Sequence, residues 1–193
     1  MRCFLALDLP DGVKESVERA AVRAKRLGVR ASFVASEQVH VTLAFFGEIN
    51  EAEAERIKET VERECAAVSP FKVKVRGTRF LPDERRPRVF YAAIDSPELV
   101  ALQKKLALAL RYDEGRPFHC HATVARFKQG VYRESLKQLA EEFGRAEFGE
   151  FEASEIVLKK SVLGAEGAQH SVIARFPFKA GASASSLTSA SST

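Results

Sequence analysis

Apolar and polar residues alternate along several short segments of this chain, and that spacing is typical of a β-strand with one buried face. The first such segment lies at the N-terminus, where Cys3, Leu5 and Leu7 share one side of the strand. Alternation of the same kind predicts further strands over residues 32–35, 39–46, 71–80, 88–94, 119–127, 151–163 and 169–178.

Between the strands, apolar residues recur every three or four positions, which is the spacing of one face of a helix. The clearest case runs from Asp11 to Leu27 and is followed by Gly28, a residue that commonly ends helices. Three more helices are predicted, one opening at a capping box of Asn50 and Glu53, one at Ser96-Pro97, and one around Leu136, Leu139 and Phe143. The order β-α-β-β-α-β-β-α-β-α-β-β predicts an α+β fold.

The length of 193 residues suits one domain, or two small lobes that share a core. We assign residues 1–179 to this domain. Residues 180–193 are rich in Ser and Ala and nearly free of large apolar groups. Such a segment cannot bury enough surface to offset the entropy of ordering, so it is predicted to be a disordered tail.

No stretch of 18 or more apolar residues is present, which argues against a membrane span. The N-terminal strand lacks the apolar region and the cleavage site of a signal peptide. The three cysteines, Cys3, Cys65 and Cys120, show no CxxC spacing and are predicted to be reduced thiols. These features favour a cytoplasmic protein, which we expect to be a monomer.

The formal net charge of +4 and the pI near 9.0 favour an anionic partner. Arg85, Arg86 and Arg88 form a basic loop between two predicted strands. A run of this kind is either a solvated turn or a surface that follows an RNA backbone.

A six-residue pattern occurs twice, 81 positions apart, as His40-Val-Thr42-Leu-Ala-Phe45 and His121-Ala-Thr123-Val-Ala-Arg126. Both copies lie in predicted strands, so each strand presents an imidazole and a hydroxyl on one face. An imidazole exchanges protons near neutral pH, and a hydroxyl donates to anionic oxygens. Two such pairs facing each other would form a site for acid–base attack on a phosphoryl group.

On these motifs the chain resembles the 2H phosphoesterase superfamily, and within it the RNA 2′,3′-cyclic phosphodiesterases, also called the 2′-5′ RNA ligase family. The likeness extends over residues 1–178. It includes the opening strand 1–10, the Phe-Gly-Glu exit of the first motif at 46–48, the central hairpin at 80–92 and the second motif at 118–127. The residue before the second histidine is commonly Pro in this family, but here it is Cys120, preceded by His119.

The resemblance implies a bilobal fold, with two antiparallel sheets and outer helices flanking a central cleft. It also implies metal-independent hydrolysis of RNA 2′,3′-cyclic phosphate ends to 2′-phosphomonoesters, with no cofactor, and a reversible 2′-5′ ligase reaction. The implied partners are RNA with such ends, including tRNA halves, or small cyclic nucleotides.

The resemblance implies His40 and His121 as the catalytic pair, with His121 as the base for water and His40 as the acid; the similarity of the motifs leaves the opposite assignment open. Thr42 and Thr123 would hydrogen-bond the phosphoryl oxygens. Arg126 is implied to assist phosphate binding. Simple alternation, however, points its side chain away from His121, unless a bulge redirects it.

Several other residues have competing interpretations. His119-Cys120-His121 suggests zinc, but no second ligand pair has suitable spacing, so no metal site is predicted and His119 is expected at the rim. His170 is expected to be solvated or structural. Candidates for stacking on a base, most of which must instead fill the core, are Phe45, Phe46, Phe80, Phe90, Tyr91 and Phe127.

Two rival functions remain compatible with the sequence. One is a non-catalytic RNA-binding domain, against which the retention of both motifs argues. The other is a related phosphodiesterase acting on a 2′-5′ oligoadenylate, an exonucleolytic RNA end or a cyclic nucleotide. Substrate choice among these is expected to lie in the loops.

Overall fold

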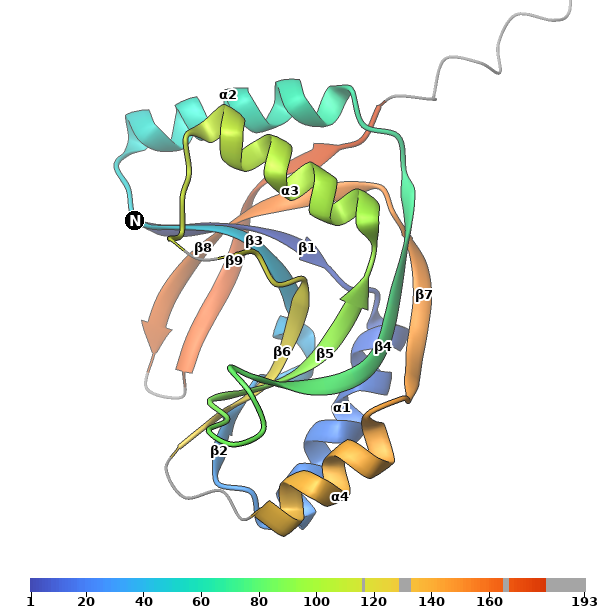
Figure 1. Ribbon diagram of the computed structural model, residues 1–193. Coiled ribbons are helices and arrows are strands. Elements are labelled where there is room, and N and C mark those ends of the chain that lie inside the picture. The colour runs from blue at the N-terminus through green and yellow to red at the C-terminus, as the bar shows by residue number, and fades with distance from the viewer. Residues whose placement is uncertain (116, 129–132, 165–166, 180–193) are drawn as a thin grey trace, which may run out of the picture.

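The computed structural model describes residues 1–115, 117–128, 133–164 and 167–179 (Figure 1). The tail predicted over 180–193 lies outside the described residues. The elements are β1 (Arg2–Asp8), α1 (Asp11–Arg26), β2 (Ala31–Phe33), the 3-10 helix η1 (Ser36–Gln38), β3 (His40–Glu48), α2 (Glu51–Ala66), β4 (Phe71–Leu81), β5 (Val89–Asp95), α3 (Pro97–Leu110), β6 (His121–Phe127), α4 (Arg133–Phe143), β7 (Glu147–Ala153), β8 (Glu155–Gly164) and β9 (Gly167–Pro177).

The strands form one antiparallel sheet in the order β7-β4-β5-β6-β3-β1-β8-β9, with β2 paired to β6. The sheet has two halves. The His121 half contains β7, β4, β5, β6 and β2, and the His40 half contains β3, β1, β8 and β9. Val41 of β3 lies opposite Ala122 of β6, and this pair joins the halves. The α+β class is therefore confirmed, and the two expected sheets are the halves of one continuous sheet.

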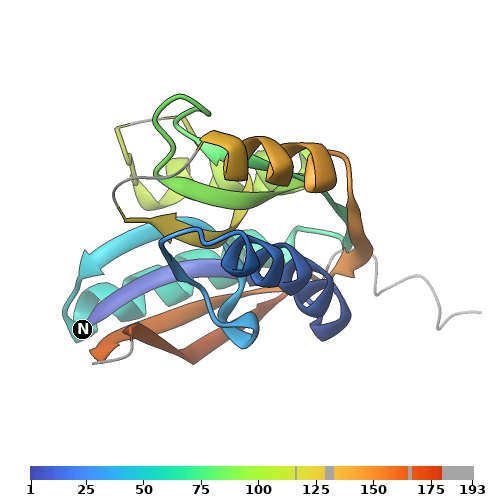
Figure 2. The same ribbon diagram turned by 90° about the horizontal axis from the view of Figure 1, so that it is seen from below.

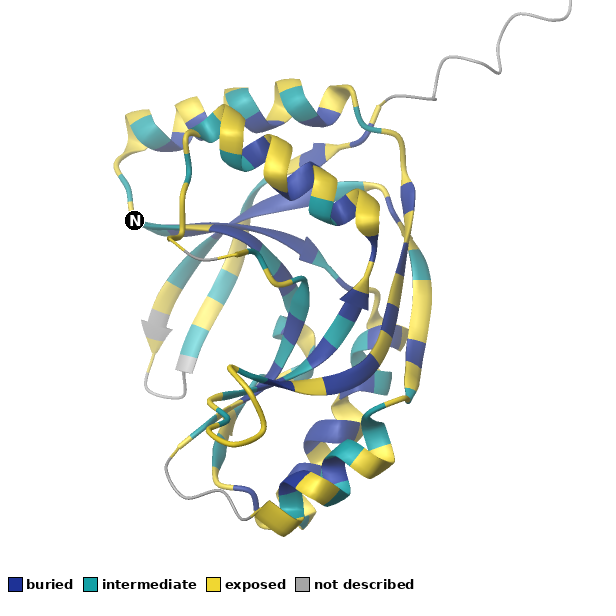
Figure 3. Cartoon of the chain, in the orientation of Figure 1, coloured by how far each residue is buried: buried dark blue, intermediate teal, exposed yellow. Residues whose placement is uncertain are grey.

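The sheet is strongly curled, and the helices gather in two pairs at its ends (Figures 1 and 2). α2 and α3 pack together and contact the His40 half through β9 and β3. α1 and α4 pack together and contact β6, β7 and β4 of the His121 half. The main core joins these helices to the face of the sheet that carries Val41 and Ala122, and burial is greatest in the central strands and least in the edge strands β7 and β9 (Figure 3).

The helix boundaries follow the signals in the sequence. Asn50 Oδ1 accepts a hydrogen bond from the Glu53 backbone N–H at 2.9 Å, and the Glu53 carboxylate accepts one from the Asn50 N–H at 3.0 Å. This reciprocal pair is the capping box predicted for α2. Ser96 likewise caps α3 by accepting from the Leu99 N–H.

The strand predicted over residues 151–163 is wrong as a single element. It is two strands, β7 and β8, which separate at Ser154 and lie in different halves of the sheet: β7 pairs with β4, and β8 pairs with β1. Neither Gly nor Pro marks the break, but the alternation changes phase there, because Ala153 is apolar, Glu155 is polar and the next apolar residue is Ile156. Which strands β7 and β8 then pair with is decided by tertiary contacts.

Among the described residues, no helix is both long and apolar enough to cross a membrane. Cys3 and Cys65 are buried and Cys120 is half-buried, and all three are free thiols, as predicted.

Candidate active site

Both histidine–threonine pairs lie on the same face of the sheet, where its two halves meet. Val41 and Ala122 are buried, fully inaccessible to solvent, and point into the core. Their chain neighbours must point to the opposite face, because side chains alternate along a strand. Extending the register one step each way sets Thr42 beside His121 and His40 beside Thr123. All four residues are half-buried, so they remain partly accessible to a substrate.

A bulge in β6 places Arg126 on this face too. Tyr91 of β5 lies opposite Thr123, but Phe90 lies opposite Ala125 and Val89 opposite Arg126, so Val124 is the extra residue. Val124 and Ala125 are both buried. The extra residue restores Arg126, which is exposed, to the face of Thr123. The expectation from simple alternation is therefore overturned, and the bulge is the reason.

The first motif contains the same bulge. Ala6 of β1 lies opposite Thr42, but Leu5 lies opposite Ala44, so Leu43 is the extra residue. Phe45 consequently occupies in β3 the position that Arg126 occupies in β6. Phe45 is 39% exposed, and the Arg2 guanidinium carbon lies 4.9 Å from the centre of its ring. In each motif, the first and third residues, His and Thr, therefore face the site. The fourth and fifth residues form the buried bulge, and because of it the sixth residue faces the site again.

The two catalytic candidates are oriented by equivalent contacts. His40 Nδ1 lies 2.6 Å from the Gln38 carbonyl oxygen, and His121 Nδ1 lies 2.7 Å from the His119 carbonyl oxygen. A carbonyl only accepts, so Nδ1 donates in both rings and fixes the tautomer. Nε2 is then the nitrogen through which each neutral ring can accept a proton. His119, which is exposed, contributes through its backbone.

His40 lies in an apolar setting that favours the neutral ring. Its centroid is 5.0 Å from that of Phe4 and 5.3 Å from that of His170. Burial lowers the pKa of His40 to about 4; the positive charge of Lys159 acts in the same direction, while the hydrogen bond to Gln38 and the charge of Asp8 oppose it. His40 is therefore neutral at pH 7 in the unliganded protein.

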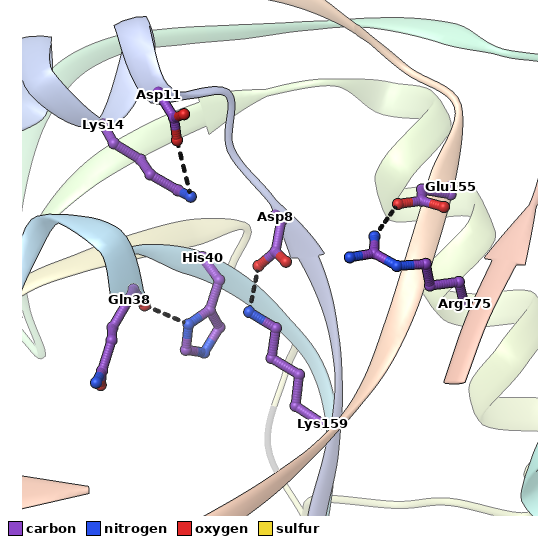
Figure 4. A network of polar contacts seen from close by, with 8 residues as sticks. All are labelled: Asp8, Asp11, Lys14, Gln38, His40, Glu155, Lys159 and Arg175. Atoms are coloured by element: carbon purple, nitrogen blue, oxygen red, sulfur yellow. Dashed lines mark hydrogen bonds and ion pairs between the residues drawn. The ribbon is translucent and has the colours of Figure 1, made fainter. Parts of the chain in front are cut away.

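A partly buried ion pair lies beside His40 (Figure 4). Lys159 Nζ donates to Asp8 Oδ1 at 2.5 Å, and the Lys159 residue is 6% exposed. Asp8 lies opposite His40 in the β1–β3 ladder, and Lys159 lies opposite Phe4 in the β1–β8 ladder. Both groups therefore belong to the site face. Sequence analysis missed them, because nothing local marks the pairing of residues 151 positions apart.

His121 is in contact with Tyr91 of β5. The two rings meet edge to face, with their centroids 5.3 Å apart. Burial raises the pKa of the Tyr91 phenol, so this group is neutral at physiological pH. Tyr91 was a candidate for stacking on a base, and the structure places it on the site face.

The remaining aromatic candidates occupy other places. Phe80 and Phe90 are buried and stack on each other, and Phe127 packs against Phe80. Phe46 packs against Tyr112, whose hydroxyl accepts from the Phe45 N–H at 3.1 Å. Of the six candidates, Phe45 and Tyr91 therefore face the site.

The basic loop is an exposed turn. The Asp83 carboxylate accepts hydrogen bonds from the Arg85 and Arg86 backbone N–H groups, at 2.7 and 3.0 Å. Arg85, Arg86 and Arg88 are all exposed. In the part of the chain that the structure describes, no three His, Cys, Asp or Glu side chains are grouped as metal ligands would be.

Comparison with known proteins gives consistent matches over most of the chain. The family model described as the 2′-5′ RNA ligase superfamily matches residues 9–164. The RNA 2′,3′-cyclic phosphodiesterase of Methanothermobacter thermautotrophicus is 32% identical over 167 residues, which are 84% of this chain and 91% of that protein. Its counterpart in Methanocaldococcus jannaschii is 31% identical, covering 90% and 98% of the two chains.

Solved structures share the fold. The crystal structure of TT0787 of Thermus thermophilus superposes with a TM-score of 0.79 at 27% identity, covering 93% of this chain and 98% of that one. E. coli LigT complexed with 3′-AMP superposes with a TM-score of 0.72 at 22% identity, covering 92% and 97%. The chain therefore belongs to the 2′-5′ RNA ligase superfamily.

Proposed function

We propose that the protein hydrolyses RNA 2′,3′-cyclic phosphate ends to 2′-phosphomonoesters. The observation that carries the proposal is the pair of imidazoles on one face, each anchored through Nδ1 to the carbonyl two residues upstream. Such a pair supplies the base and the acid that in-line displacement at phosphorus requires. The names of the relatives, RNA 2′,3′-cyclic phosphodiesterases, support this choice of substrate.

In the proposed reaction, one neutral imidazole takes a proton from water while the water oxygen attacks phosphorus. The bond from phosphorus to O3′ breaks, and the other imidazole, protonated, gives its proton to O3′. If a 5′-hydroxyl replaces water as the nucleophile, the same displacement forms a 2′-5′ linkage. This substitution would account for a ligase reaction at the same site.

The low pKa of His40 favours His40 as the base and His121 as the acid, the reverse of the assignment implied by resemblance. A base must be neutral when the substrate binds, and burial keeps His40 neutral at pH 7. His121 would then supply the proton for O3′.

Thr42, Thr123 and Arg126 are proposed to bind the phosphoryl oxygens. The register puts Thr42 and Thr123 on the face of the imidazoles, and the bulge in β6 puts position 126 on that face too, which supports this role. Hydroxyl and guanidinium donors stabilise the negative charge that accumulates on these oxygens during displacement. Phe45, at the matching position of the first motif, offers an exposed ring for stacking on a base.

A substrate panel tests the proposal. Purified protein in EDTA would be assayed on RNA ending in a 2′,3′-cyclic phosphate, on cyclic mononucleotides and on 2′-5′ dinucleotides, with His40→Ala as the control. We expect EDTA-resistant turnover of the RNA end to a 2′-phosphate, lost in the control. Turnover that needs a divalent ion, or a clear preference for another substrate, would refute the proposal. Binding of RNA without turnover would indicate the non-catalytic alternative.

A further inference from the structure

His170 of β9 lies on the site face, although its sequence suggested only a solvated or structural strand residue. It is opposite Ser161 of β8, which shares a side of that strand with Lys159. Lys159 is in turn opposite Phe4, on the same side of β1 as Asp8, the neighbour of His40. These strand pairings therefore place His40 and His170 on the same face of the sheet.

The His170 ring contacts both Phe4 and His40. Its centroid lies 4.8 Å from that of Phe4 and 5.3 Å from that of His40, with interplanar angles of 73° and 74°. β9 is three strands away from β3, a separation of about 14 Å in a flat sheet. The rings nevertheless meet, because the sheet is curled and not flat (Figure 1).

The surroundings of His170 favour the neutral form of its imidazole. Its Nδ1 is buried and has no hydrogen-bond partner among the described residues. Burial lowers the pKa of His170, and the positive charge of Lys159 acts in the same direction, against Asp8. A buried nitrogen without a partner is rare in folded proteins and calls for a specific explanation.

We propose that His170 is a positioning residue of the site, which holds the His40 imidazole against Phe4 and shields it from water. The groups that face His40 are known from the structure. Gln38 contributes a carbonyl oxygen, Asp8 and Lys159 form an ion pair, and Phe4 and His170 contribute the two ring contacts. Phe4 belongs to β1, which is adjacent to the strand of His40, whereas His170 belongs to the edge strand β9.

Removing the His170 ring should therefore admit water to His40. Burial is the largest cause of the low pKa of His40, so the pKa of His40 should rise from about 4 towards its ordinary value of 6.5. A phenyl ring at position 170 would preserve the shielding. It would also eliminate the unpartnered nitrogen.

The test is an NMR titration of the four histidines in the full chain, with the His40 signal assigned from its absence in His40→Gln. We expect His170→Ala to raise the pKa of His40 by more than one unit and His170→Phe to leave it low. In the pH profile of kcat/KM, the apparent pKa that reports on His40 should shift in the same direction. Val162→Ala, on the same hairpin but 52% exposed, is the matched control and should change neither.

An unchanged His40 titration in His170→Ala, with only a lower Tm, would show that His170 is merely structural. Loss of activity in His170→Phe with His40 still titrating low would show that the imidazole touches the substrate, which also refutes a positioning role. The inference rests on the proposed function for the kinetic measurement alone. If the RNA end proves not to be the substrate, the titration still decides the question.

Discussion

At the scale of single residues, the two motif histidines have the same anchoring but different surroundings. His40 contacts Phe4 and His170 and lies beside an ion pair, whereas His121 contacts the neutral phenol of Tyr91. In the proposed reaction, these different neighbours would decide which imidazole acts as the base and which as the acid.

This difference can be tested with the leaving group. On a cyclic phosphate analogue whose leaving oxygen is an activated phenolate, no proton is needed at that oxygen. We expect His121→Ala to recover much of its activity on the analogue, relative to an RNA end, and His40→Ala to remain impaired on both. The measurement is kcat/KM for both variants on both substrates. Rescue of His40→Ala instead would restore His40 as the acid.

The doubled histidine before the second motif gives a simpler prediction. His121→Ala should lose about 100-fold or more in kcat, the usual effect of removing a general acid or base. His119→Ala should keep most of the activity, because His119 orients His121 through its backbone carbonyl, which the substitution retains. The reverse ranking in a steady-state assay would mean that the catalytic histidine is His119.

Thr78 offers a test of stability away from the site. It is 2% exposed, and its hydroxyl has no hydrogen-bond partner among the described residues. Thr78→Val keeps the shape and removes the unpaired group, so the free energy of unfolding should rise by about 1 kcal/mol. Thr78→Ala is the comparison, since it removes the hydroxyl but also leaves a cavity. A lower urea midpoint for Thr78→Val would contradict the prediction.

At the scale of elements, the bulges explain both what the sequence predicts well and what it does not. Strand alternation is a local property, so the sequence places the imidazole and hydroxyl of each motif on one face. The position of Arg126 depends on the extra residue Val124, which is visible only in the pairing of β6 with β5. The break at Ser154 was missed for the same reason, because strand partners are chosen by tertiary contacts.

The residues that surround His40 are a second feature that the local sequence pattern does not predict. Asp8 and Lys159 meet because β1 pairs with β8, and His170 reaches His40 because the sheet curls. Helix caps, by contrast, can be predicted from the local sequence. The capping box of α2 involves residues three apart, so the sequence alone was sufficient to predict it.

Gly77 in β4 gives a prediction about how α4 is fixed to the sheet. Its φ is +74°, and a Cβ there would lie 2.6 Å from the Gly144 carbonyl oxygen at the end of α4. Gly28 is a matched control, with φ +71° but no atom within 4 Å of such a Cβ. Gly28→Ala should cost about 1 kcal/mol for its backbone conformation, and Gly77→Ala about 2–4 kcal/mol. If both variants lose the same free energy of unfolding in urea, the backbone at Gly144 must move aside at little cost.

At the scale of the whole molecule, net charge and the basic loop predict salt-dependent binding of RNA. A chain of net charge +4 that binds a polyanion releases counterions, so KM for an RNA end should rise steeply with NaCl. A cyclic mononucleotide carries one phosphate and should show a much smaller slope. The Arg85→Ala/Arg86→Ala variant should weaken the salt dependence for RNA and leave the mononucleotide unaffected. Identical slopes for both substrates would exclude backbone contacts by the loop.

The two halves of the molecule are interlaced along the chain. β1 belongs to the His40 half, but the helix that follows it, α1, packs on the His121 half; α3 follows β5 of the His121 half and packs on the His40 half. The later strands likewise divide between the halves, with β7 joining β4 and β8 joining β1. Neither half can therefore be completed from one continuous stretch of the described sequence.

This interlacing has a consequence for synthesis on the ribosome. Both motifs emerge well before β8 and β9, yet Lys159 and His170, which complete the surroundings of His40, lie on those two strands. A nascent or prematurely ended chain that stops before Glu155 would carry every motif residue while leaving His40 open to water. We expect such fragments to be poor catalysts, so the activity of the site should appear only after β8 and β9 have been synthesised.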